Sequence, residues 1–257
     1  MNKQTDIALQ SLSFISTEYI LSCIKDLHIA YQKAKSEMTL AKFQSNKVDG
    51  LKLTLDALFN GMNEEEVINA EVQRQSDKSI NNAIGTFHEQ LMGGLPGIKN
   101  YTVGHGFDIK SNDNTIIGEI KNKHNTLNSS SAKATFEKLE GFANQYPNAT
   151  AYLILIIAKK STDKVWTPGG KYHPRVRIIS ADQFYAKVTG IEDAFFQLCN
   201  FIPKAVQFYL QNLEQVHHSQ ESTLFKQLSE QTDDSSSDFW QRLIYETFET
   251  YKGFQRY

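Results

Sequence analysis

The chain has 257 residues, 40% of them hydrophobic and 22% charged, which is typical of a globular protein with a core of its own. Its two cysteines, Cys23 and Cys199, lie too far apart in sequence to suggest a disulfide framework or a zinc site, and they favour a reducing compartment. The first residues lack the pattern of a signal peptide, and the longest apolar run, 151–158, is too short to cross a bilayer. We therefore expect a soluble cytoplasmic protein with no membrane partner.

The net charge of −2 is unevenly distributed along the chain. The segment from Lys99 to Arg177 holds 12 of the 27 basic residues and only 6 of the 29 acidic residues, so its net charge is +6 and that of the remainder is −8. A basic segment within an acidic chain can attract the phosphates of a nucleic acid locally. Ordinary surface charge is the alternative, and the charge count alone favours neither.

The N-terminal third is predicted to be helical. Apolar residues at helical spacing indicate one long or two shorter helices over 6–36, and another short helix over 51–61 that ends at a glycine. Residues 78–92 form an amphipathic pattern that Ser76 or Asp77 can cap. Its apolar side chains recur at i, i+4, i+7 and i+11: Ile80, Ile84, Phe87 and Leu91.

The pattern changes to strands in the middle of the chain. Residues 101–110 and 115–123 alternate as strands on either side of the polar turn 111–114, so a β-hairpin is expected. The elements that follow are a helix to about residue 146 capped by Asn128-Ser129-Ser130-Ser131, a buried strand over 150–158, a loop over 164–174, a strand over 176–179 and a short helix from Ser180 to Gly190. This order predicts a mixed α/β core.

The C-terminal end of the chain is again predicted to be helical. We expect a helix from Glu192 to about residue 216 with a break near Pro203, a polar stretch over 231–237 and a last helix over 238–251. The whole chain is interpreted as one domain, 1–257. Within it we predict a helical N-terminal region (residues 1–76), a catalytic α/β core (residues 77–190) and a helical C-terminal region (residues 191–257).

One group of residues in the hairpin suggests chemistry. Glu119 and Lys121 share a face of their strand because side chains alternate, and the hairpin folds Asp108 back beside them. Two carboxylates with an ammonium next to them suit Mg²⁺, which prefers carboxylate and water oxygens. Such a site could polarise a phosphate, while Lys121 orients the attacking water.

Two alternatives remain open at this point. Glu119-Ile120-Lys121 is the only Glu-x-Lys triplet in the chain, but such a triplet can also belong to an exposed strand with a cross-strand ion pair. A second register, with Asp108-Ile109-Lys110 as the carboxylate–lysine pair, lacks an upstream acid on a strand and ranks lower.

Several further residues are candidates for the same site. Glu89 is a candidate extra carboxylate, and a solvated helix position is its alternative. Polar and basic residues after the hairpin and after the buried strand could contact DNA, with turn and cap chemistry or ordinary loop packing as alternatives. They are Lys123, His124, Asn125, Asn128, Ser129, Ser130, Lys159, Lys160, Lys171, Tyr172, His173 and Arg175.

The run from Gly106-Phe107-Asp108 through Gly118-Glu119-Ile120-Lys121 to Ser131 resembles the active-site region of type II restriction endonucleases of the PD-(D/E)xK superfamily. More narrowly, it resembles the group that cuts GGNCC-type sites. Residues 82–89 and 184–190 are also similar to segments of that group, so the resemblance covers roughly residues 78–190. Phe107 departs from the superfamily pattern, in which a proline often precedes the aspartate.

The resemblance implies a three-layer α/β/α restriction-endonuclease-like core with a mixed sheet, flanked by N- and C-terminal helical additions. It also implies a homodimer that uses Mg²⁺ to cut double-stranded DNA and leaves 5′-phosphate and 3′-hydroxyl ends. By motif position, Asp108, Glu119 and the carbonyl of Ile120 would hold the metal, and Lys121 would orient the water. A repair or junction nuclease with the same site, and a non-catalytic helical interaction protein, are the alternatives.

Overall fold

The computed structural model describes residues 9–36, 43, 45, 48–101, 104–213, 245 and 247–254. The chain forms two compact units: residues 23–87 are the helical unit, and residues 1–22 together with 88–257 are the sheet unit. The organisation into one domain with three regions stays a prediction. Within the described ranges, no helix combines the length and the apolar character that a bilayer span needs.

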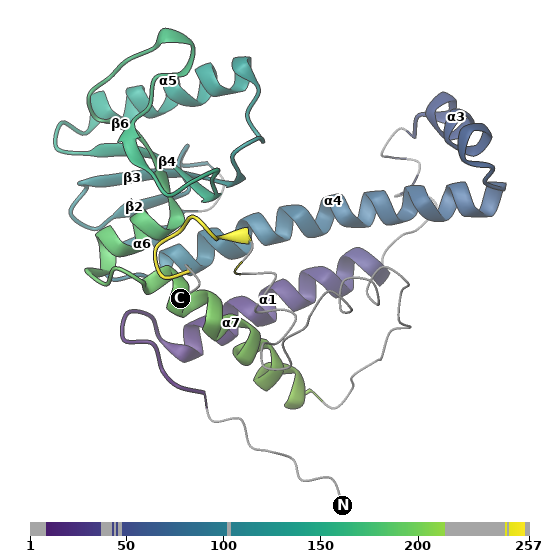
Figure 1. The fold of residues 1–257 in the computed structure, drawn as a ribbon, viewed down its shortest axis with the longest axis horizontal. Helices are drawn as coiled ribbons and strands as arrows, with labels where there is room; N and C mark the ends of the chain where they lie inside the picture. The colour runs from purple at the N-terminus through teal and green to yellow at the C-terminus, as the bar shows by residue number, and fades with distance from the viewer. Residues whose placement is uncertain are drawn as a thin grey trace, which may run out of the picture. The chain divides into compact units, whose positions relative to one another are not determined.

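The sheet unit is built on a six-stranded mixed sheet with the strand order β1-β2-β3-β4-β6-β5 (Figure 1). The strands are β1 (Ile98–Asn100), β2 (Ile109–Ser111), β3 (Ile116–Lys123), β4 (Thr150–Ile157), β5 (Asp163–Val165) and β6 (Val176–Ser180). The pairs β3–β4 and β4–β6 are parallel, and the pairs β1–β2, β2–β3 and β5–β6 are antiparallel. The predicted mixed α/β core is confirmed, with β1 and β5 as additional edge strands.

Helices cover both faces of this sheet (Figure 1). On one face, Phe136 and Leu139 of α5 (Ser129–Gln145) pack in one cluster with Leu153 of β4. On the opposite face, Phe184 of α6 (Ala181–Thr189) meets Tyr152 of β4 edge to face. β4 is therefore buried on both sides, as its apolar sequence predicts. The α/β/α layers confirm the predicted fold class.

β2 and β3 form the expected hairpin, closed by a polar turn. The carboxylate of Asp113 accepts hydrogen bonds from the Ser111 hydroxyl and from both the amide and the hydroxyl of Thr115. These bonds satisfy the backbone of the turn locally, which fixes the register of the two strands.

The predicted strand over 101–110 is wrong for most of its length. β1 ends at Asn100, residues 104–108 form a series of bends, and β2 begins only at Ile109. Gly104 and Gly106 adopt φ values of 118° and 82°, which lie outside the extended region and favour glycine. The chain therefore leaves strand geometry just before Asp108.

The segment from β3 to α6 largely agrees with the sequence pattern. Asn128 caps α5 as predicted, because its side chain accepts a hydrogen bond from the amide of Ser131. Gly190 ends α6 in the left-handed conformation. The predicted loop over 164–174 is wrong at its start, which belongs to β5, and it also contains the 3-10 turn η1 (Pro168–Gly170).

The C-terminal helix α7 (Ala194–Gln211) continues through Pro203, so the predicted break there is wrong. A proline removes one helix hydrogen bond, and the buried side chains of α7 on either side of Pro203 keep the helix packed. Three rings beyond α7 surround Phe195: Phe248, Tyr251 and Phe254. The predicted polar stretch 231–237 and most of the predicted helix 238–251 lie outside the described residues.

Helix α1 (Thr17–Ser36) begins later than the helix predicted over 6–36. Residues 9–16 are not helical, and residues 1–8 lie outside the described residues. The hydroxyl of Ser16 accepts a hydrogen bond from the amide of Tyr19, so it satisfies one of the free amides at the start of the helix.

Helix α4 (Glu64–Gly93) is one long helix that includes the predicted segment 78–92. Ser76 and Asp77 lie inside it, so the predicted cap is wrong. The helix instead follows a capping box, in which Asn63 and Glu66 each accept a hydrogen bond from the other's backbone amide. The pattern Asn-x-x-Glu in the sequence predicts this capping box.

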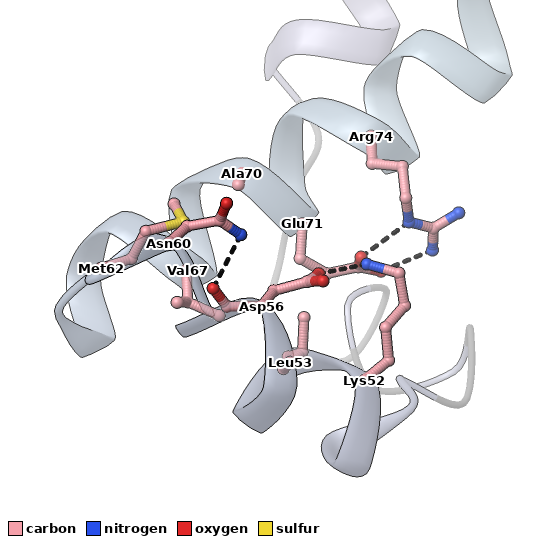
Figure 2. A pocket seen from close by; sticks show the side chains of 9 residues that line it. All are labelled: Lys52, Leu53, Asp56, Asn60, Met62, Val67, Ala70, Glu71 and Arg74. Carbon is pink, nitrogen blue, oxygen red and sulfur yellow. Dashed lines mark hydrogen bonds and ion pairs between the residues drawn. The ribbon is translucent and has the colours of Figure 1, made fainter. Parts of the chain in front are cut away.

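In the helical unit, α3 (Gly50–Asn60) agrees with the predicted helix and ends at Gly61 in the left-handed conformation. α3 and α4 line a pocket of about 250 Å³ (Figure 2). Glu71 is only 4% exposed there and accepts two hydrogen bonds from Arg74 and one from Gln75. The bonds from Arg74 lower the pKa of Glu71 to about 2 despite its burial. This network joins residues three and four positions apart and therefore stabilises α4 itself.

We expect Glu71→Gln to lower the free energy of unfolding by about 1–2 kcal/mol at neutral pH, because charge-assisted hydrogen bonds to Arg74 are lost. The folded-state pKa of about 2 lies below the ordinary value of 4.5, so this stabilisation is present above about pH 4.5 and is lost as the pH falls toward 2. Urea unfolding followed by circular dichroism measures both effects. Glu65→Gln, at an exposed position of the same helix, is the control, and equal losses in the two variants would contradict the prediction.

Candidate active site

The loop before β2 holds Asp108 against β3. The amide of Asp108 donates to the carbonyl of Gly118 at 2.9 Å, and its Oδ2 accepts a hydrogen bond from the amide of Ile120 at 2.7 Å. The carboxylate therefore lies against the segment of β3 that carries Glu119 and Lys121, as the hairpin predicts.

Aromatic packing anchors this loop. Phe107 is buried, and its ring meets those of Phe142 in α5 and Tyr101 edge to face at 5.2 and 5.0 Å. A Cβ atom at Gly106 would lie only 2.9 Å from the Phe142 ring, so the close approach needs glycine. Phe107, which stands where a proline is common in similar enzymes, thus fixes the backbone before Asp108 by packing.

Glu119 and Lys121 project from the same face of β3, since they are two residues apart. The Lys121 ammonium lies 2.7 Å from Glu119 Oε1. Glu119 is only 7% exposed, whereas 31% of the Lys121 side chain is exposed. The structure therefore brings the three central residues predicted from the sequence together at one place.

Lys138 of α5 is a fourth member of this group that sequence reasoning missed. Its ammonium lies 2.6 Å from Glu119 Oε2, so each oxygen of the Glu119 carboxylate has its own lysine. No spacing motif marks Lys138, which adjoins the buried stripe of α5 at Leu139. Only the packing of α5 on the sheet brings it to β3.

Glu89, in the last turns of α4, is half-buried and is coupled electrostatically to the same group. Burial, together with the charges of Asp108 and Glu119, raises the pKa of Glu89 to about 7, and the charge of Lys121 opposes this only in part. The protonation of Glu89 is therefore coupled to the charges of these three side chains. A fully solvated helix position, the alternative for Glu89, does not agree with its partial burial.

The two central carboxylates differ in their affinity for a proton. Burial raises the pKa of Asp108, as does the nearby Glu119 charge, and the hydrogen bond from Ile120 only partly opposes this. Burial also acts to raise the pKa of Glu119, but the hydrogen bonds from Lys121 and Lys138 outweigh it, and the pKa is lowered. Glu119 is therefore the more firmly ionised of the two.

The donor set fits a hard divalent cation. The amide of Ile120 donates a hydrogen bond to Asp108. In a strand, the carbonyl of a residue points to the same side as its amide, so the Ile120 carbonyl also points to the side of Asp108, beyond the end of β2. Two carboxylates and this carbonyl are oxygen donors of the kind Mg²⁺ accepts. Among the described residues, no three Asp, Glu, His or Cys side chains group closely enough to enclose an ion, so water or phosphate oxygens would have to complete its coordination.

The predicted DNA-contacting residues fall into two groups. The first follows the carboxyl ends of the parallel strands β3 and β4, where the amide of His124 donates to the carbonyl of Ile157. All of its members are exposed: Lys123, His124, Asn125, Asn128, Ser129, Ser130, Lys159 and Lys160. Of these, Asn128 uses its side-chain oxygen to cap α5.

The second group lies between η1 and β6 and comprises Lys171, Tyr172, His173 and Arg175. The guanidinium of Arg175 donates to the carbonyls of Tyr146 and Ala149 at 3.0 and 2.7 Å, and the His173 ring lies 3.3 Å from the Asn144 side chain. These contacts are at the C-terminal end of α5, away from the first group. His173 and Arg175 thus hold this loop on α5, while Lys171 pairs with Glu137 and Tyr172 is 66% exposed.

The sequence of this chain is similar to those of type II restriction enzymes. The sequence model of the family described as Eco47II restriction endonuclease matches residues 12–211. The chain is 43% identical over 212 residues to the type II restriction enzyme Sau96I of Staphylococcus aureus, a match that covers 78% of this chain and 81% of that protein. It is 29% identical over 215 residues to the type II restriction enzyme Eco47II of Escherichia coli, covering 77% of this chain and 88% of that protein.

We expect the metal-free protein to lose stability as the pH rises from about 4.5 through 7, because folded Glu89, with a pKa of about 7, keeps a proton that the unfolded chain releases at its ordinary value of 4.5. Glu89→Gln should lack this loss, so its stability relative to the parent chain should increase up to about pH 8. Urea unfolding in the presence of a chelator measures this. Glu192→Gln, at an exposed position, is the control; parallel pH profiles of Glu89→Gln and the parent chain would refute the expectation.

Proposed function

We propose that this chain, which belongs to the Eco47II restriction endonuclease family, uses Mg²⁺ to hydrolyse double-stranded DNA at a short palindromic G/C-rich site of the GGNCC type. It is a type II site-specific deoxyribonuclease. Beyond this activity, we propose the metal, the recognised sequence, and the 5′-phosphate and 3′-hydroxyl ends of the products. The observation that carries it is the convergence of Asp108, Glu119 and Lys121 at β3.

In this proposal, Asp108, Glu119 and the Ile120 carbonyl hold the cation. When bound, Mg²⁺ supplies a Lewis acid that polarises the scissile phosphate and lowers the pKa of a bound water. The Lys121 ammonium donates a hydrogen bond that orients the attacking water and offsets negative charge as it develops on the phosphate. Glu89 is the further carboxylate, whose pKa in the metal-free protein is raised by burial, and it is proposed to exchange a proton with the site.

DNA is proposed to approach the carboxyl ends of β3 and β4. The exposed lysines there, Lys123, Lys159 and Lys160, suit contacts to the DNA backbone, and His124, Asn125 and Asn128 carry donors and acceptors that can read base edges. The exposed Ser129 and Ser130 start α5, where free amides favour a phosphate. Lys171 and Tyr172 remain candidates for outer contacts, whereas His173 and Arg175 already hold the fold.

A palindromic site presents the same sequence twice, related by a twofold axis. One copy of the chain offers a single set of catalytic residues, so a homodimer places one set on each strand. We therefore propose a homodimer that acts in the cytoplasm. Light scattering of the purified protein tests the dimer directly.

Incubating the protein with plasmid DNA and Mg²⁺ tests the proposed function. Discrete fragments whose ends map to one short sequence support it. Nicking, or cleavage of branched DNA only, would indicate a repair or junction nuclease instead. No cleavage with any divalent cation would indicate the non-catalytic alternative.

Lys121→Ala should reduce the rate of cleavage by about 10²–10³-fold, because the variant lacks the cation that stabilises the transition state. DNA binding, measured by fluorescence anisotropy with Ca²⁺ in place of Mg²⁺, should stay within about twofold, since the backbone-contacting lysines are intact. Lys99→Ala, at an exposed position in β1, is the matched control and should cleave normally. Loss of DNA binding in Lys121→Ala would show that this lysine is structural.

A further inference from the structure

The second lysine on Glu119 has no role in the mechanism above. Lys121 and Lys138 each lie within hydrogen-bond distance of a different oxygen of the same carboxylate, at 2.7 and 2.6 Å. The Glu119 side chain is 9% exposed, so little water reaches it. An ionised carboxylate that is buried in this way is costly unless it is paired, and the two ammonium groups supply that pairing.

An incoming divalent cation would bind a carboxylate whose two oxygens each already accept a hydrogen bond from an ammonium group. Magnesium at Glu119 would bring two further positive charges within a few ångströms of both ammonium groups. In a partly buried site, the repulsion between such charges exceeds the gain from one hydrogen bond. This repulsion favours the release of one lysine from Glu119 when the cation binds.

The two lysines differ in their role at the site. Lys121 lies two residues from Glu119 on the same face of β3, and the proposed mechanism needs its ammonium there to orient the attacking water, although 31% of its side chain is exposed. Lys138 extends from α5, and 38% of its side chain is exposed, so rotation about its four-carbon stem can carry the ammonium into solvent.

We propose that Lys138 is a displaceable counterion. It neutralises Oε2 of Glu119 in the metal-free enzyme, gives up this oxygen to the cation, and thereby weakens the binding of Mg²⁺ by the free protein. Lys138 is thus a positioning residue that acts through Glu119. The inference rests on the proposed function, because it takes Glu119 as a metal ligand.

The test is calorimetric titration of the full chain with Mg²⁺ alone, without DNA. Lys138→Met keeps the length and apolar stem of the side chain but removes its charge, and it should bind Mg²⁺ about tenfold more tightly than the parent chain. Lys133→Met, an exposed position of the same helix, is the matched control for net charge and should change the affinity by less than about twofold. Lys138→Arg keeps the charge and should bind Mg²⁺ like the parent chain.

Thermal unfolding gives a second readout that does not need a tight site. With a chelator, Lys138→Met should melt at a lower temperature than Lys133→Met, because Glu119 loses a partner. Added Mg²⁺ should raise the melting temperature of Lys138→Met by more than that of the parent chain. A role of Lys138 in packing alone would lower the melting temperature with and without Mg²⁺ to the same extent.

The proposal is overturned if Lys138→Met binds Mg²⁺ more weakly than Lys133→Met or with equal affinity. Cleavage of plasmid DNA by the parent chain separates the two possible failures. If the parent chain cleaves with Mg²⁺ and Lys138→Met gains no affinity, only the role of Lys138 is wrong. If the parent chain neither cleaves DNA nor binds Mg²⁺, the proposed function and the role of Lys138 fail together.

Discussion

The hydrogen bond from the Ile120 amide to Asp108 Oδ2 is the constraint on which the site depends. It couples the loop before β2 to β3, and it sets the Asp108 carboxylate beside the strand that carries Glu119. The turn at Asp113 fixes the hairpin register from one end, and Phe107 fixes the loop from the other by packing on α5. A shift by one residue would turn Glu119 to the opposite face of the sheet.

In the absence of metal, the positive charges of two lysines offset the negative charge of Glu119. Two lysines keep Glu119 ionised, while burial and the neighbouring carboxylates hold the pKa values of Asp108 and Glu89 above their ordinary values. A divalent cation favours ionised carboxylates, so its binding would draw protons off this group. The two lysines that stabilise ionised Glu119 in the metal-free protein therefore oppose binding of the cation. In the role proposed above, Lys138 relieves this repulsion by leaving Glu119.

The DNA-contact candidates show where local sequence is ambiguous. Lys123 and Arg175 look equivalent in sequence, as basic residues beside loops. In the structure, Lys123 ends β3 in solvent, whereas the guanidinium of Arg175 is engaged by two carbonyls at the end of α5. A basic side chain in a loop can serve either purpose, and only its neighbours decide which.

The sequence alone determined the elements whose signals are local: the hairpin with Glu119 and Lys121 on one face, the cap of α5 at Asn128, and the buried strand β4. These follow from side-chain alternation, capping chemistry and apolar runs, which depend on neighbours a few residues away. The tertiary structure decided the rest. It bent the chain at Gly104 and Gly106 and brought Lys138 to Glu119, because packing between distant elements sets such contacts and leaves no fixed spacing in the sequence.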